Sequence, residues 1–317
     1  LKVAGVPPDY FSATGQLWGN PLYAWEAHQK EGFSWWISRI RHQLRSLDIL
    51  RIDHFRGFQA YWSVPYGEKT AIRGKWIEAP GEELFRAIQA ALGGELPIIA
   101  EDLGIITPEV DALRKSFGFP GMKVLQFAFE STGESDYLPH QYKDPGCVCY
   151  TGTHDNDTTL GWYQTLSPDC QRRLRRYLRC TDDETRISRE LIAAAQGSIA
   201  GYVIFPLQDV LGFGSSARMN TPGTASGNWS WRFANGALRD ELAAALREDT
   251  ILYGRYHLPA PQTENEPQTE KDLLSDKELE EPAVLEAPSC KEVQIEVSKM
   301  EEVSEESASG LEDTADV

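Results

Sequence analysis

Residues 50–58 read LRIDHFRGF, in which apolar residues typical of a buried strand lead to Asp53. This aspartate lies between Arg51 and Arg56 and next to His54. Buried strands keep aspartate and arginine only where these groups are paired or take part in chemistry. The stretch therefore predicts a strand that ends in an ion pair or in a reactive carboxylate.

Further short apolar runs follow along the chain, and helical patterns separate them, which is typical of βαβ units that build a parallel sheet. The predicted strands are Leu47–Asp53, Leu96–Glu101, Met122–Phe127, Cys149–His154 and Tyr202–Leu207. The predicted helices are Phe33–Ser46, Gly81–Leu92, Pro108–Phe117, Thr181–Gln196 and Asn235–Glu248. The sequence thus indicates an α/β fold with a parallel sheet.

The composition is that of a soluble globular protein with a large core, since 41% of the 317 residues are apolar. No run of about 18 apolar residues occurs, so no membrane span is predicted. The five cysteines are irregularly spaced and lack paired CxxC spacing, which favours a reduced, intracellular setting over a zinc site. Lysine and arginine form no cluster of the kind that nucleic-acid binding needs.

The acidic charge is concentrated at the C-terminal end. Residues 258–317 hold 18 acidic and 4 basic side chains, which gives −14 of the formal net charge of −17 and leaves −3 for the other 257 residues. This segment has few aromatic residues and cannot bury enough surface to offset its ordering entropy. We predict a disordered acidic tail, either a solvated extension or an interaction segment that recruits the chain as a scaffold.

Carboxylates occur at the ends of three predicted strands: Asp53, Glu101 in IIAEDLG, and Asp155 after His154 in YTGTHDNDT. The carboxyl ends of parallel strands share one face, so we expect these side chains to converge. Three such groups suit glycoside chemistry. One is the nucleophile, a second stays protonated as the general acid, and a third faces the developing positive charge.

Arg51 lies two residues before Asp53 and hence on the same strand face, where its charge would keep Asp53 ionised. Glu101 has no cation as near in sequence, so burial is expected to raise its pKa for proton donation. Structural alternatives stay open for each group. Asp53 and Arg51 would form a buried ion pair. Glu101 and Asp102 would cap the next segment, and GTHDNDT would be only an Asx-rich turn.

Aromatic residues favour a sugar as the ligand. The stretch DYFSATGQLWGNP, a loop punctuated by proline and glycine, carries Tyr10, Phe11 and Trp18 as candidates to stack on sugar rings.

A later segment of loop character, ARMNTPGTASGNWSWRF, offers Asn220 as a contact for a sugar hydroxyl group. Its Trp229 and Trp231 are expected to lie in the core. No spacing indicates a zinc, P-loop or dinucleotide site, whereas the sequence alone leaves a calcium site open.

Several segments, in their order along the chain, closely resemble the 4-α-glucanotransferases, also called amylomaltases or disproportionating enzymes, which are relatives of the α-amylases. They are VAGVPPDYFSATGQLWGNP, RIDHFRGF, IIAEDLG, YTGTHDNDTT and ARMNTPGT with NWSWR, and the resemblance spans residues 1–257. It implies a (β/α)8 TIM barrel that moves a segment of one α-1,4-glucan to an acceptor sugar by a retaining, two-step mechanism. The partners that it implies are maltooligosaccharides, amylose or other α-1,4-glucans. No nucleic acid, membrane, organic cofactor or metal is expected to take part.

The resemblance also implies roles for single residues. The aspartate that matches Asp53 is the family's nucleophile, the glutamate that matches Glu101 is the acid/base, and the aspartate that matches Asp155 stabilises the transition state. Arg51 and His154 match contacts to the sugar at the cleavage point.

The loop that holds Tyr10, Phe11 and Trp18 resembles the family's lid beside the acceptor sites. Such a lid would favour a sugar hydroxyl over water as the attacking group.

The chain departs from the family in its number of strands, because a barrel needs eight and the sequence predicts five. The family places about the first three strands before VAGVPPDYF. We therefore expect residues 1–257 to be the C-terminal part of a catalytic domain, with 258–317 as a tail outside the family pattern. Two open sheet edges would leave the chain poorly folded or prone to associate.

Other functions stay open on the sequence alone. An amylase-type hydrolase uses the same three carboxylates, and a glucan-binding remnant would bind without turnover. A bacterial cytoplasm is the first expectation for the compartment and a plastid the second.

Overall fold

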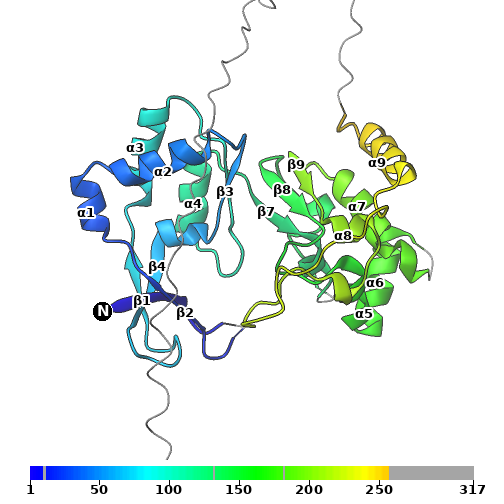
Figure 1. The fold of residues 1–317 in the computed structure, drawn as a ribbon, viewed down its shortest axis with the longest axis horizontal. Helices are drawn as coiled ribbons and strands as arrows, with labels where there is room; N and C mark the ends of the chain where they lie inside the picture. The colour runs from blue at the N-terminus through cyan, green and yellow to red at the C-terminus, as the bar shows by residue number, and fades with distance from the viewer. Residues whose placement is uncertain (10–11, 131–132, 181–182, 257–317) are drawn as a thin grey trace, which may run out of the picture. The chain divides into compact units, whose positions relative to one another are not determined.

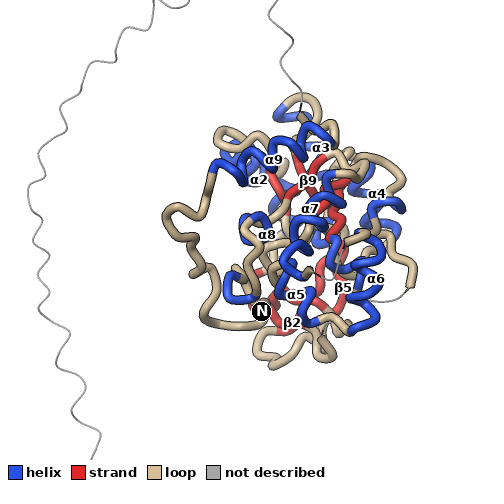
Figure 2. The backbone as a smooth tube through the Cα atoms, turned by 90° about the vertical axis from the view of Figure 1, so that its right-hand side faces the viewer, coloured by secondary structure: helices blue, strands red, loops and turns tan. Residues whose placement is uncertain are grey.

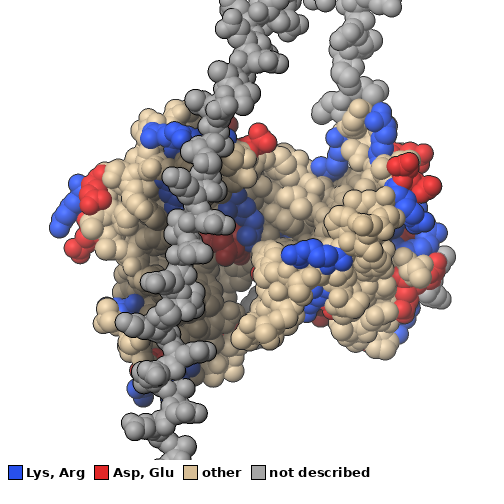
Figure 3. All heavy atoms as spheres, viewed as in Figure 1, with Lys and Arg blue, Asp and Glu red and all other residues tan. Residues whose placement is uncertain are grey.

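A computed structural model describes residues 1–9, 12–130, 133–180 and 183–256 (Figure 1). Residue contacts divide the chain at residue 258, and all of the described residues belong to the first unit. None of the helices in the described ranges is long and apolar enough to cross a bilayer. On the face drawn in Figure 3, side chains of both charge signs are mixed.

All of the predicted parallel strands are present, each shorter than predicted, and the third and fourth begin earlier, at Gly121 instead of Met122 and at Cys147 instead of Cys149. They are β3 (Leu50–Ile52), β6 (Ile98–Ala100), β7 (Gly121–Val124), β8 (Cys147–Tyr150) and β9 (Tyr202–Ile204). β3 pairs with β6, and β7, β8 and β9 form a second ladder in that order. The Ala100 N–H donates to the Pro120 carbonyl at 2.9 Å, which joins β6 to the start of β7.

Alternate residues of these strands belong to different clusters, because successive side chains of a strand point to opposite faces. Ile98 and Ala100 pack with residues of α2 (Ser34–Gln43), α3 (Gly81–Leu92) and α4 (Pro108–Ser116). Ile99, which lies between them, belongs to a separate cluster on β6, β7 and β8. Its members are Ile99, Met122, Val124, Val148 and Tyr150. Helices therefore cover one face of the strands, and strand side chains line the other.

Cys147 and Cys149 of β8 pack outward against three more helices, α5 (Thr159–Thr165), α6 (Pro168–Leu178) and α7 (Ile187–Gln196), which Figure 2 shows next to the strands. The remaining helices are α1 (Trp25–Lys30), α8 (Leu207–Val210) and α9 (Asp240–Leu252). Short 3-10 turns are η1 (Phe55–Phe58), η2 (Leu125–Phe129), η3 (Pro139–Gln141), η4 (Glu184–Arg186) and η5 (Ser215–Ala217).

An antiparallel sheet that the sequence did not predict lies beside these elements. Its strand order is β2 (Gln16–Pro21), β1 (Lys2–Val6), β4 (Ala60–Pro65) and β5 (Lys75–Glu78). The prediction that DYFSATGQLWGNP is a loop was therefore wrong for its second half, where Trp18 lies in β2. Pairing with β1 overrides the local turn signals, and the backbones come so close that a Cβ on Gly5 would lie 2.5 Å from the Gln16 carbonyl oxygen.

Candidate functional site

The ends of β3 and β6 bring Asp53 and Glu101 out of the sheet side by side. Leu50 is opposite Ile98 and Ile52 is opposite Ala100. The Glu101 N–H then donates to the Ile52 carbonyl at 2.9 Å, which carries the ladder to the last residue before Asp53. Because both strands run in the same direction, the two carboxyl groups meet at one edge.

Asp53 is an exposed carboxylate that forms an ion pair with a cation of its own strand. Arg51 Nη1 lies 3.0 Å from Asp53 Oδ1, and the Asp53 side chain is 79% exposed, against 31% for Arg51. The alternative of a buried structural ion pair is therefore wrong, and an exposed pair of this kind contributes little to stability. Arg51 also donates to the Met122 sulfur at 3.8 Å, so it lies between Asp53 and β7.

Glu101 is held by backbone donors on both oxygens. Its Oε2 accepts the His54 N–H and its Oε1 accepts the Leu103 N–H, each at 2.7 Å. Burial raises the pKa of the Glu101 carboxyl above its ordinary value, and the charge of Asp53 adds to the rise. The two N–H groups and Arg51 act in the opposite direction. The carboxyl thus has both the capping role considered for it and an environment that favours the protonated form.

Trp18 reaches this edge from β2. Its ring meets the His54 ring edge-on, with 4.8 Å between the centroids, and the residue is 44% exposed. The structure therefore brings one of the three predicted aromatic contacts to the strand ends. Tyr10 and Phe11 lie outside the described residues.

Asp155 belongs to a second group of residues, built on the segment after β8. His154 Nε2 lies 3.4 Å from Asp155 Oδ1, and the Asn220 side-chain amide donates to the same oxygen at 2.6 Å. Arg218 donates to the Asp155 carbonyl at 2.7 Å. Asn220, which was predicted to contact a sugar hydroxyl, thus donates one of its side-chain N–H groups to a carboxylate of the site.

The turn that carries Asp155 is stabilised by its own side chains as well. Asn156 Oδ1 accepts the N–H and the hydroxyl of Thr153, both at 2.9 Å. The Asx-turn alternative for GTHDNDT is therefore correct as a local description, and the same turn presents His154 and Asp155. In the described part of the chain, no hydrogen bond or ion pair joins Asp155 to Asp53 or Glu101.

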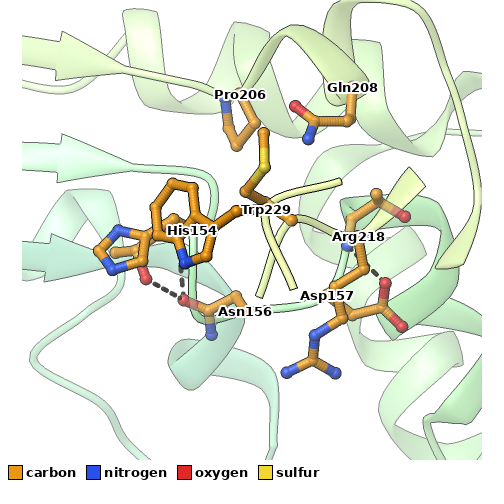
Figure 4. Close-up of a pocket in the computed structure, with 10 residues that line it drawn as sticks. His154, Asn156, Asp157, Pro206, Gln208, Arg218 and Trp229 are labelled. Atoms are coloured by element: carbon orange, nitrogen blue, oxygen red, sulfur yellow. Dashed lines mark hydrogen bonds between the residues drawn. The ribbon is translucent and has the colours of Figure 1, made fainter. Parts of the chain in front are cut away.

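A pocket of about 130 Å³ lies beside His154 (Figure 4). The Trp229 ring lies next to the His154 ring, with 5.2 Å between their centroids, and Pro206 and Gln208 lie above them in this view. Trp229 is 55% exposed, so the prediction that it belongs to the core was wrong. It sits at φ 60° in a stretch rich in glycine and polar residues.

Sequence reasoning missed Trp229, Arg218 and the buried Asp209 as parts of this region. Two signals could have found them: Arg218 and Trp229 share the loop of Asn220, and Asp209 follows a predicted strand as the other carboxylates do. Within the described ranges, no group of three or more His, Cys, Asp or Glu side chains is arranged to hold a metal ion.

Residues 2–238 match the model of a protein family described as 4-alpha-glucanotransferase. The chain is 58% identical over 257 residues to the 4-alpha-glucanotransferase of Synechocystis sp., covering 80% of this chain and 51% of that one. It is 54% identical over 250 residues to the enzyme of that name from Thermus thermophilus, covering 77% and 50%. The chloroplastic/amyloplastic protein of that name from Solanum tuberosum is 52% identical over 258 residues, covering 80% and 44%.

A solved structure is also similar, the amylomaltase from Streptococcus agalactiae in complex with acarbose. Its TM-score is 0.77 at 41% sequence identity, over 81% of this chain and 52% of that chain. This chain thus spans about half the length of the curated relatives and of the structure that it matches.

Proposed function

Because the chain belongs to the 4-α-glucanotransferase family, we propose that it transfers a segment of an α-1,4-glucan to an acceptor sugar, either glucose or another α-1,4-glucan. Maltooligosaccharides and amylose are the proposed substrates. The observation that carries the proposal is the pair of strand-end carboxyls: an exposed Asp53 beside Arg51, and a half-buried Glu101 whose pKa is raised by burial and by the charge of Asp53.

In the first step, the Asp53 carboxylate attacks the anomeric carbon while Glu101 gives its proton to the departing glycosidic oxygen. A covalent glycosyl-enzyme remains. In the second step, Glu101 takes the proton of the acceptor hydroxyl, which attacks the anomeric carbon and releases Asp53. The Arg51 guanidinium lies beside the nucleophile, 3.0 Å from the Asp53 oxygen.

Asp155 is proposed as the third carboxylate, which stabilises the positive charge of the sugar in the transition state. His154 and Arg51 would contact the sugar at the cleavage point, and Asn220 a nearby hydroxyl group. The contacts of Asp155 with His154 and Asn220 support a shared role, since all three side chains meet at one oxygen.

Transfer rather than hydrolysis requires that water be kept from the glycosyl-enzyme. We assign this task to the aromatic residues of the 10–18 stretch, Tyr10, Phe11 and Trp18. The contact of Trp18 with His54, which follows Asp53 directly, supports the assignment for Trp18.

For the fold, we propose that residues 1–257 provide five strands of a (β/α)8 barrel and that 258–317 form a tail outside it. The parallel order of the strands and the helices packed on one face support this architecture. A bacterial cytoplasm is the proposed compartment and a plastid the alternative, since the relatives include bacterial proteins and one named as chloroplastic/amyloplastic. Fractionation of the source cells tests this assignment.

Incubation with maltotriose, with products resolved by size, tests the function. Glucose together with a ladder of longer maltooligosaccharides is the expected result. Maltose and glucose alone would instead establish an amylase-type hydrolase.

A glucan-binding fragment without turnover is the second candidate, because the chain spans about half the length of its relatives. Titration calorimetry with a maltooligosaccharide separates the two: heat of binding without any product would favour the fragment.

A further inference from the structure

Asp209, in α8 just after β9, closes the segment that carries Asp155. It is 2% exposed. Its Oδ2 accepts the hydroxyl groups of Thr151 and Thr159, and its Oδ1 accepts the Thr159 N–H, each at 2.7 Å. Both threonines are fully buried, at 0% exposure. One carboxylate thus ties together the two ends of the turn between them, on which His154 and Asp155 lie.

Residues near Asp209 in the sequence, from Gln208 to Arg218, make further contacts that hold the turn between Thr151 and Thr159. Gln208, its neighbour, donates to the Ala217 carbonyl at 3.1 Å. This contact fixes the stretch from which Arg218 donates to the Asp155 carbonyl at 2.7 Å. Ser215 donates to Asp157 at 2.6 Å, closer to the surface. The buried carboxylate is the anchor of this set because it alone receives three hydrogen bonds.

We propose that Asp209 is a positioning residue that sets the place of Asp155. Within the described ranges it forms no hydrogen bond or ion pair with Asp155, and it acts through the two ends of the turn. A carboxylate suits this task, since it accepts three donors with two oxygens and leaves none of these buried groups without a partner. Burial raises the pKa of Asp209 while the hydrogen bonds from Thr151 and Thr159 oppose the rise. The kinetic part of this inference rests on the proposed function.

The test compares Asp209→Ala and Asp209→Asn with the unchanged chain. For maltotriose disproportionation, Asp209→Ala should lower kcat by about 100-fold with little change in KM, because a displaced Asp155 affects the transition state more than substrate binding. Asp209→Asn should recover part of this loss. Its oxygen still accepts the Thr159 N–H, and the threonine hydroxyls can turn to accept from the new amide.

Amide hydrogen exchange followed by mass spectrometry gives a readout that needs no turnover. In Asp209→Ala, exchange should quicken in the peptide that covers residues 151–159 and stay unchanged in β7 and α3. Ser188→Ala is the control for a general loss of packing, since Ser188 is a polar residue of α7 at 3% exposure. If Asp209→Ala fails to fold, Thr151→Val removes one hydroxyl donor and should give a smaller loss of kcat in the same direction.

Unchanged exchange in 151–159 would overturn the inference, whether or not the chain turns over maltotriose. Faster exchange there with an unchanged kcat would also overturn it. So would a rise in KM as large, in fold, as the fall in kcat, if Ser188→Ala shows the same pattern. If the unchanged chain yields no products, the proposed function fails by itself and the exchange result alone decides on Asp209.

Discussion

His54 joins several features of the site at a single residue. Its backbone is in the left-handed region, at φ 47° and ψ 53°, which is uncommon for a residue with a side chain. This conformation belongs to the residue whose N–H donates to Glu101 and whose ring meets Trp18. Backbone strain of this kind persists only where surrounding contacts hold it, and here they also fix the acid/base candidate.

The His54 ring predicts a pH dependence of stability. Burial and the charge of Arg56 lower its pKa from 6.5 to about 4, so the folded state keeps the ring neutral. The unfolded chain binds a proton below about pH 6.5, so this part of the stability is present above that pH. It is lost as pH falls through the folded pKa of about 4.

His54→Asn removes the titration, and asparagine tolerates the left-handed conformation. Between about pH 7 and pH 4 the melting temperature of the unchanged chain should fall more steeply than that of the variant. Parallel melting curves by circular dichroism would contradict this account of His54.

At the scale of elements, the sequence predicts the parts whose pattern is local. α3 begins at Gly81 and ends at Leu92 as predicted, because its apolar positions repeat at helical spacing. α6 was missed, since arginine fills much of PDCQRRLRRYL and only Cys170 and Leu174 are buried. Its start is set by Ser167, whose side chain accepts the Cys170 N–H. In the missed antiparallel sheet, β1 pairs locally with β2 and β4 with β5, and only the pairing of β1 with β4, in which Lys2 is opposite Pro65, joins segments far apart in the chain.

In the candidate site, too, features with a local sequence pattern were predicted and contacts between distant segments were not. Strand-end carboxylates such as Asp53 and Glu101 can be read from the sequence, because a charge after an apolar run is visible locally. Contacts between distant segments, such as Asn220 with Asp155, cannot. The exposure of Trp229 depends on which layers cover it, and a single tryptophan in a sequence does not reveal that.

At Gly81, the first residue of α3, the helix packs closely against η1, the turn that follows Asp53. A Cβ at this position would lie 2.2 Å from the Phe58 carbonyl oxygen, a backbone atom that cannot rotate away. Gly81→Ala should lower the free energy of unfolding by about 1–3 kcal/mol through overpacking. Gly214→Ala is the matched control, because no atom lies within 4 Å of its added Cβ. Equal stability of the two variants in denaturant unfolding would refute this contact.

For the whole molecule, β9 is the terminal strand of its ladder in the described part of the chain. Tyr202 and Ile204 of this strand are 45% and 46% exposed, whereas parallel strands usually have both faces covered. We expect the chain to associate through this apolar strand. Sedimentation velocity at rising concentration should show growing species, and Ile204→Lys should reduce them. A compact monomer with a cooperative melt at all concentrations would rule this out.

The division of charge leads to another prediction about the whole chain. Residues 258–317 hold −14 of the net charge of −17, and the proposed catalytic part ends at residue 257. A chain cut after residue 257 should keep its melting temperature and its maltotriose product pattern. A lower melting temperature, measured by calorimetry on both chains, would mean that the tail stabilises the catalytic part.

The central claim is that Asp53 is the nucleophile of a retaining transfer reaction. The most direct measurement is mass spectrometry of peptides after the chain reacts with a fluorinated α-glucosyl fluoride. This donor is chosen because the glycosyl-enzyme forms from it faster than the glycosyl-enzyme breaks down. The account predicts a sugar adduct on Asp53, absent in Asp53→Asn and kept in Asp48→Asn, an exposed acid at the opposite end of β3. An adduct on another carboxylate, or none in a chain that produces the maltooligosaccharide ladder, would contradict it.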